Sequence, residues 1–228
     1  MTYGMNEFLR DLVEKDIPPN DQIYSYLSTT DLPRLKTLLA RLDKVRSLDV
    51  TQLAKLRPAS HKHKAKKATQ GQQTKLLGKI LEIVMLTLLR GCHGISVGAN
   101  LRSTTSEIDF MVQVGPTAFI IPIFKSAATH LIGEAKCYKS GFKSEWVNEL
   151  VGLMQAHSTT HSILFTASPS KVLRADHRHL IQLHGMKGDR VIPFGLAQVN
   201  EIANGKNFLK VLSDQYVRVL NATSDLAI

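Results

Sequence analysis

The sequence predicts an α/β protein in which a central mixed sheet is flanked by helices and preceded by a small all-helical unit. Three observations support this class. Leucines recur at helical spacing within residues 1–56, short apolar segments typical of strands follow residue 94, and two amphipathic segments separate the later strands. The resulting order of helix, strand meander, helix, strand, helix and strand is typical of helices covering a mixed sheet.

Residues 1–56 are expected to form the helical unit. A first helix is predicted over residues 5–15, and a second ends at Leu27 after a cap at Asn20 or Asp21. The third begins after Thr30 or Asp31, either of which can serve as its N-terminal cap. No catalytic constellation is present in this unit, so DNA recognition, dimerisation or docking of a partner protein is its expected role.

Residues 57–73 are basic, polar and poor in apolar side chains, which predicts a linker. We expect either a flexible arm that contacts phosphates or a plain solvated linker. Four lysines crowd the histidines of this segment and would repel a metal cation. These lysines are Lys62, Lys64, Lys66 and Lys67.

Residues 74–228 are expected to form the sheet-containing domain. A helix apolar over most of its circumference is predicted over residues 74–90 and stopped by Gly91. Strands are predicted at residues 94–101, 106–115, 117–124, 130–138, 161–168 and 191–199, and helices at residues 144–158, capped by Ser144, and 174–185. The pattern of residues 207–220 fits a helix or a strand equally well.

The net charge of +10 is unevenly distributed. Residues 1–56 carry eight basic and eight acidic side chains, whereas residues 57–228 carry 21 basic and 11 acidic ones. This excess favours a polyanionic partner, above all nucleic acid. The alternative is a basic protein without a specific partner.

Composition also excludes several classes of protein. Two cysteines, Cys92 and Cys137, are too few for a disulfide framework or a zinc cluster. No apolar run reaches the roughly 20 residues of a membrane span, and the first residues lack the apolar core of a signal peptide. We therefore expect a cytoplasmic protein that does not enter a membrane.

The candidate chemistry lies at residues 131–141, LIGEAKCYKSG. Glu134 and Lys136 share one face of a strand because they are two residues apart. Asp109, on an earlier strand, can meet Glu134 if the strands are neighbours. Two converging carboxylates repel each other unless a cation such as Mg²⁺ lies between them, with Cys137 or the backbone carbonyl of Ala135 as a further ligand. The alternative is an ordinary ion pair on an exposed face.

These residues also carry a resemblance. The segments SEIDF and GEAK resemble the PD-(D/E)xK nuclease superfamily, whose fold is restriction-endonuclease-like. The longer segment LIGEAKCYKSGFKSEWVNELVGLMQAHSTTHSILFTAS is similar to the catalytic domain of Mrr-type restriction endonucleases. The resemblance spans roughly residues 74–200. The sequence departs from the family pattern in lacking a proline before Asp109 and in its long separation of Asp109 from Glu134, which predicts an additional strand pair between them.

The resemblance implies that Asp109 and Glu134 are metal ligands and that Lys136 is the catalytic lysine. It also implies that Glu82 is an outer ligand and that Gln155 faces the site. From the residues alone, Glu82 could instead pair with Lys79, and Gln155 could be a polar residue at the border of its helix. The implied cofactor is Mg²⁺, which Mn²⁺ can replace.

The function expected from these residues is metal-dependent DNA endonuclease activity, in restriction or in defence against foreign DNA. DNA, or alternatively RNA, is the expected partner, and cleavage of both strands favours a homodimer or larger assembly. The alternative is a nucleic-acid-binding module on the same fold without catalysis. Phosphate contacts are expected from the four lysines of the linker and from Lys125, Lys139 and Lys143.

Overall fold

The computed structural model describes residues 19–49, 62–102, 107–127, 129–137, 142–167 and 173–221. The helix expected over residues 5–15 and the predicted phosphate contact Lys139 lie outside these ranges. Side chains are described for all of these residues except 19–21, 62–69 and 102.

The centre of the fold is a five-stranded mixed sheet in the order β1-β2-β3-β4-β5. Its first three strands form an antiparallel meander, and β3, β4 and β5 run parallel. The strands are β1 (Ile95–Arg102), β2 (Glu107–Val114), β3 (His130–Lys136), β4 (His161–Thr166) and β5 (Arg190–Gly195). A mixed sheet flanked by helices is therefore confirmed, and β2 shows the predicted alternation of buried and more exposed residues.

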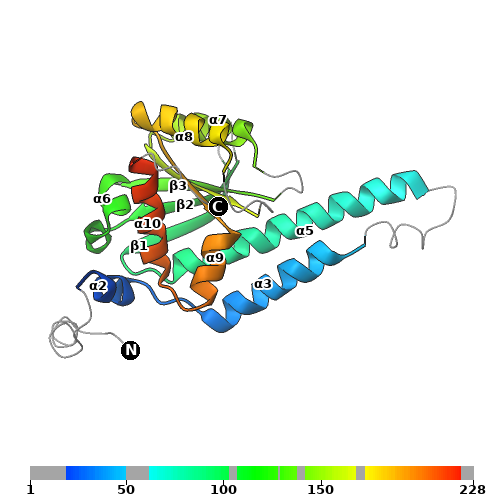
Figure 1. The fold of residues 1–228 in the computed structure, drawn as a ribbon, viewed down its shortest axis with the longest axis horizontal. Helices are drawn as coiled ribbons and strands as arrows, with labels where there is room; N and C mark the ends of the chain where they lie inside the picture. The colour runs from blue at the N-terminus through cyan, green and yellow to red at the C-terminus, as the bar shows by residue number, and fades with distance from the viewer. Residues whose placement is uncertain are drawn as a thin grey trace.

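Helices cover both faces of this sheet (Figure 1). The crossover helices α7 (Ser144–Ala156) and α8 (Ala175–Met186) lie on one face, where α7 packs its residues Val147 and Leu150 into a core with Ile132 and Leu164 of the sheet. The opposite face carries the main core. Its helices are α5 (Lys62–Arg90), α9 (Leu196–Ala203) and α10 (Phe208–Leu220), joined by α2 (Pro19–Leu27) and α3 (Leu32–Ser47).

The described part of the N-terminal unit shares the core of the sheet domain. Leu35, Leu38 and Leu42 of α3 are buried in one cluster with α5 and the sheet. As expected, Asp31 caps α3, because its side chain accepts a hydrogen bond from the backbone N–H of Arg34 at 3.0 Å. The expected boundary at residue 56 therefore does not separate two hydrophobic cores in the described residues.

The linker prediction is wrong for residues 62–73. These residues are the first turns of α5, which continues unbroken to Arg90 and extends beyond the sheet in Figure 1. Gln73 ties this part of α5 to the end of α3, since its Nε2 donates a hydrogen bond to the carbonyl of Val45 at 2.6 Å. The polar composition of residues 62–73 predicted a solvated linker. These residues are helical because they continue directly into the apolar part of α5.

Three further predictions of secondary structure need correction. Residues 117–124 are not a strand. They form a 3₁₀ helix, η2 (Pro116–Ile120), followed by α6 (Pro122–Ala127). Each of these helices begins with a proline, a residue that is well suited to the first turn of a helix. No additional strand pair is therefore present between β2 and β3 in the described residues.

The predicted cap of α7 also differs: Ser144 is the first residue of α7, and Lys143 occupies the capping position. The strand predicted over residues 191–199 ends at Gly195, where α9 begins, and residues 207–220 contain the helix α10.

None of the described helices combines the length and the apolar character that crossing a bilayer requires.

Gly133→Ala is expected to destabilise the protein by about 1–3 kcal/mol, the usual cost of overpacking a core. A Cβ atom at Gly133 would lie 1.9 Å from the ring of Phe110, which is 1% exposed and pairs with Gly133 across β2 and β3. Urea denaturation measures the loss. The control is Gly152→Ala in α7, where nothing lies within 4 Å of the added carbon and a gain of about 0.5–1 kcal/mol is expected. Equal effects of the two substitutions would contradict the close packing of Phe110 on Gly133.

Candidate active site

Two acidic residues lie close together on neighbouring strands. The antiparallel register of β2 and β3 pairs Phe110 with Gly133, and Asp109 and Glu134 are the next residue on each strand beyond this pair. The charge of Asp109 acts on the Glu134 carboxyl group, as expected of neighbouring acids. The backbone N–H of Ala135 donates a hydrogen bond to Asp109 Oδ2 at 2.7 Å, which anchors the Asp109 carboxylate against the end of β3.

Lys136 lies on the same face as Glu134, as the spacing of two residues predicted. Its Nζ atom is 2.8 Å from Glu134 Oε1 and 3.5 Å from Oε2 of Glu149 in α7. The side chains of Lys136 and Glu134 are 21% and 14% exposed, whereas that of Glu149 is 59% exposed. The lysine therefore bridges a shielded carboxylate and a carboxylate in contact with solvent.

Burial and repulsion raise the pKa of both strand carboxyl groups. For Glu134 burial is the largest cause, the charge of Asp109 adds to it, and Lys136 opposes it. For Asp109 burial again dominates, the Ala135 N–H and Lys136 oppose it, and Glu107 adds to it. Burial by itself would lower the pKa of Lys136, but the hydrogen bond to Glu134 and the surrounding carboxylates raise it overall. The site thus holds carboxylates whose charge a bound cation would stabilise.

Glu82 of α5 lies close enough to Asp109 for the two charges to interact. Its pKa is raised, first by burial and then by the charge of Asp109, while Lys79 opposes the increase. The charge of Lys79 acts on Glu82, as the expected pairing requires, and the role of Glu82 as an outer metal ligand stays a prediction. A carboxylate from the helix adds to the negative charge at the candidate site.

The carboxylates present fit a hard divalent cation. Lys136 pairs with Oε1 of Glu134, whereas the buried Oε2 has no hydrogen-bond partner, which is costly for a polar atom shielded from water. The described residues contain no group of three or more His, Cys, Asp or Glu side chains arranged to hold a metal. Mg²⁺ is compatible with this arrangement, because it is often bound through one or two carboxylates with water and substrate oxygens completing the shell.

Cys137 does not present its thiol to this site. The side chain is 7% exposed and belongs to the core on the α5 face, whereas Glu134 and Lys136 project toward α7. Burial raises the pKa of the Cys137 thiol, and the charge of Arg46 offsets this only in part. A metal ligand from the Cys137 thiol is therefore excluded, since successive strand residues point to opposite faces. A contribution from the backbone carbonyl of Cys137 or of Ala135 stays a prediction.

Gln155 lies far from the acidic pair, and the prediction that it faces the site is wrong. It is an exposed residue near the end of α7. His157, just beyond α7, accepts a hydrogen bond from His130 Nε2 at 2.9 Å, which places the end of this helix beside the start of β3. Lys136 ends the same strand, six residues after His130, which at 3.3 Å per residue is about 20 Å away.

The predicted phosphate contacts divide between the two ends of the sheet. Lys125 is in α6, which immediately precedes the start of β3, so a position beside the acidic pair is wrong for this residue. Lys143 directly precedes α7 at the opposite end of the strand, as the prediction requires. The backbone of residues 62–67, which carries the four linker lysines, forms the projecting first turns of α5, and their side chains are not described.

Sequence reasoning missed two charged residues near the ends of β3 and β4. Glu149 lies one turn after Trp146 on α7, and the amphipathic pattern of this helix does not distinguish it from the other polar residues. Arg46 of α3 donates a hydrogen bond from its guanidinium to the carbonyl of Ala167, just past β4. Ala167 in turn donates its N–H to the carbonyl of Lys136 at 3.2 Å, so Arg46 lies close to the end of β3. No local pattern in the sequence indicates this contact of α3.

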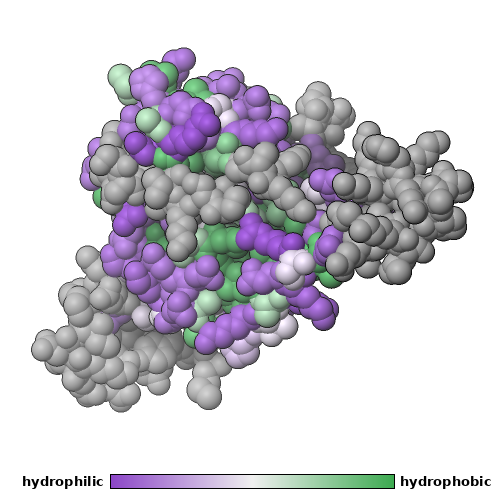
Figure 2. Space-filling view, turned by 45° about the vertical axis from the view of Figure 1, so that its right-hand side comes forward, coloured by the Kyte–Doolittle hydropathy of each residue, from purple (hydrophilic) through white to green (hydrophobic). Residues whose placement is uncertain are grey.

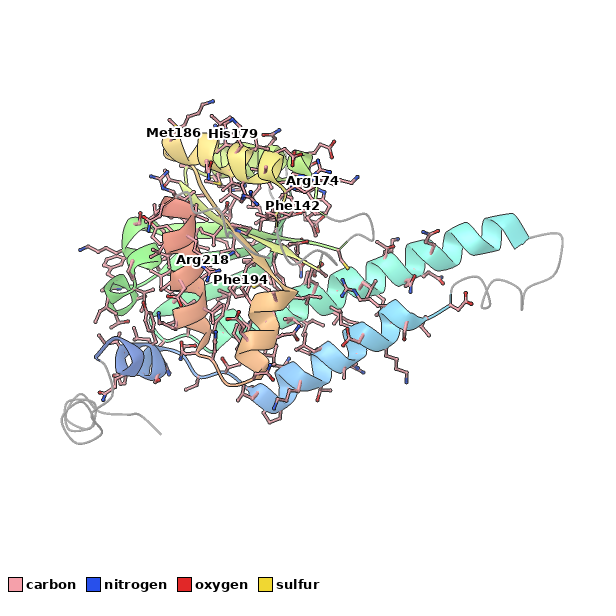
Figure 3. The ribbon with its side chains drawn as sticks, viewed as in Figure 1. Phe142, Arg174, His179, Met186, Phe194 and Arg218 are labelled. Atoms are coloured by element: carbon pink, nitrogen blue, oxygen red, sulfur yellow. The ribbon has the colours of Figure 1, made fainter. Side chains whose placement is uncertain are left out.

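Figure 2 shows hydrophilic residues above and below a central band of apolar residues. Phe142 and Arg174 lie together where α7 and α8 begin (Figure 3). The ring of Phe142 packs edge-on against that of Trp146, and its centroid lies 4.9 Å from the centroid of the His177 ring. His177 is therefore packed against aromatic residues where α7 and α8 begin.

Comparison with protein-family models, with curated proteins and with solved structures gave no match for this chain. Its function is therefore inferred from its own residues and their geometry.

Proposed function

We propose that the protein is a metal-dependent endonuclease that hydrolyses phosphodiester bonds of DNA. The observation that carries this proposal is the closeness of Asp109 and Glu134 on neighbouring strands, with Lys136 beside Glu134 and a buried Glu134 oxygen that has no hydrogen-bond partner. The proposed core is restriction-endonuclease-like, and the proposed setting is restriction or defence against foreign DNA.

Each side chain has a defined role in this proposal. Asp109 and Glu134 would hold Mg²⁺ or Mn²⁺, and Glu82 would add negative charge from α5. A bound divalent ion supplies an activated water and stabilises negative charge on the phosphate. Lys136 would orient the attacking water and donate a hydrogen bond to a phosphate oxygen, because its ammonium lies next to Glu134.

The charge of the chain supports DNA as the substrate. The net charge is +10, and the excess lies in residues 57–228. Lys143 and Arg46 lie near the end of β3, where they would contact the phosphate backbone on either side of the scissile bond. A single site per chain cleaves one strand at a time, so we propose that a homodimer cleaves duplex DNA.

Lys136→Met is expected to reduce metal-dependent cleavage by about 10²–10³-fold, the usual loss when one group that stabilises a transition state is removed. The assay follows nicking and linearisation of plasmid DNA with Mg²⁺ or Mn²⁺, with linear, single-stranded, branched and methylated substrates tested in parallel. Lys187→Met is the matched control, because it removes an exposed lysine at the other end of α8 from the strand ends. Its activity should equal that of the wild type.

Two outcomes would count against the proposal. Equal cleavage by the wild type and Lys136→Met would show that this lysine takes no part in the reaction. Salt-sensitive DNA binding without cleavage of any substrate would instead support the alternative of a nucleic-acid-binding module.

A further inference from the structure

Lys136 is held between two carboxylates that differ in their surroundings. Its Nζ lies 2.8 Å from Glu134 Oε1 within the site and 3.5 Å from Glu149 Oε2 at the solvent boundary. Glu134 is 14% exposed and Glu149 is 59% exposed. A small rotation of the flexible lysine side chain is enough to exchange one partner for the other, since both lie within 4 Å of the same atom.

The backbone that carries Glu149 is firmly placed. Its neighbours Trp146, Val147 and Leu150 are buried against the sheet in the core on the α7 face. The backbone of Glu149 is therefore held in place beside β3. A receiving group on a rigid element needs no movement of the chain.

The lysine and a divalent ion would compete for the same carboxylate. Lys136 uses Oε1 of Glu134, whereas Oε2 is buried without a hydrogen-bond partner. A cation bound to Glu134 would repel an ammonium that remains 2.8 Å from that carboxylate. The lysine can retain a charged partner only by turning to another acid, and Glu149 is the acid already within reach.

We propose that Glu149 is a positioning residue that receives Lys136 when a divalent ion binds Asp109 and Glu134, an inference that rests on the proposed metal site. Without the ion, Lys136 bridges both carboxylates and shields the charge of Glu134. With the ion, the lysine pairs with Glu149 and stays beside the metal, where the attacking water would lie. Glu149 thus lowers the cost of freeing Glu134 for the metal.

The test is a double-mutant cycle with Mn²⁺ affinity as the readout, measured by isothermal titration calorimetry without DNA. Glu149→Gln is expected to weaken Mn²⁺ binding about tenfold when Lys136 is present, an interaction of ordinary size for residues in contact. In a Lys136→Met background the same substitution should change the affinity less than about twofold. Glu145→Gln, one turn earlier on α7 and also exposed, is the matched charge control and should change little.

The outcomes separate this inference from the proposed function. An equal loss of affinity from Glu149→Gln in both backgrounds would mean that its charge acts on the ion directly, which overturns the exchange of partners. Unchanged affinity in Glu149→Gln, together with loss of binding in Asp109→Asn, would overturn the role of Glu149 and leave the metal site standing. A wild-type protein that binds no Mn²⁺ would overturn both.

Discussion

Asp109→Asn is expected to abolish metal-dependent cleavage while raising the stability of the protein at neutral pH. The cleavage rate should fall at least about 10³-fold, because a lost ligand removes several kcal/mol of metal-derived stabilisation and each 1.4 kcal/mol is a factor of ten. The fold should tolerate the change, since the amide oxygen of asparagine can still accept the hydrogen bond from the Ala135 N–H.

The gain in stability follows from the raised pKa of Asp109. Burial is the first cause of that increase, and Glu107 adds to it. An acid whose pKa is raised by folding destabilises the folded state once it ionises, so stability falls as pH rises through the folded-state pKa. Asparagine removes this cost and also relieves the repulsion that Asp109 exerts on Glu134 and Glu82. We expect a gain in stability at pH 7 that disappears once the pH is low enough to protonate Asp109 in both the folded and the unfolded state.

Thermal denaturation between pH 4 and 8, with and without Mg²⁺, measures these effects. Mg²⁺ should raise the melting temperature of the wild type and leave that of Asp109→Asn unchanged, because ligands stabilise only the state that binds them. Asp43→Asn on the exposed face of α3 is the control for charge removal away from the site. Cleavage at the wild-type rate would contradict the role of Asp109 as a metal ligand, and a loss of stability at pH 7 would contradict the cost of its burial.

Acid unfolding is expected to depend on His161, the first residue of β4. This side chain is 3% exposed, and burial, with a smaller contribution from Arg190, lowers its pKa from 6.5 to about 4. A base whose pKa is lowered by folding stabilises the folded state above the unfolded pKa, and this stability is lost as pH falls through the folded pKa. At about 1.4 kcal/mol for each pKa unit, His161 should account for about 3 kcal/mol of lost stability between pH 6.5 and 4.

His161→Gln tests this expectation because glutamine keeps a polar group near Thr160 and Tyr216 but does not titrate. His161 Nδ1 lies 2.9 Å from Thr160 Oγ1, and Nε2 lies 3.5 Å from Tyr216 Oη. Chemical denaturation at a series of pH values should show that the free energy of unfolding falls less steeply below pH 6.5 in the variant than in the wild type. His179→Gln on the exposed side of α8 should leave the wild-type profile unchanged (Figure 3). A variant as acid-sensitive as the wild type would place the titrating group elsewhere.

Local periodicity predicted most of the sheet. Alternation over residues 106–115 identified β2, the apolar run at residues 161–168 identified β4, and the amphipathic pattern after residue 144 identified α7. It failed at residues 117–124, where an apolar, β-branched composition concealed two short helices that begin at prolines. It also failed at residues 62–73, where polar composition indicated a linker although the chain continues as α5.

The common face of Glu134 and Lys136 could be predicted without coordinates, because the side-chain period of a strand is a local property. The rest of the candidate site depends on tertiary structure. The pairing of β2 with β3 brought Asp109 close to Glu134, packing placed Glu149 beside Lys136, and the direction of α7 carried Gln155 to the far end of β3. These distances depend on how separate elements pair and cross, and such contacts between distant segments leave no periodic pattern in a single sequence.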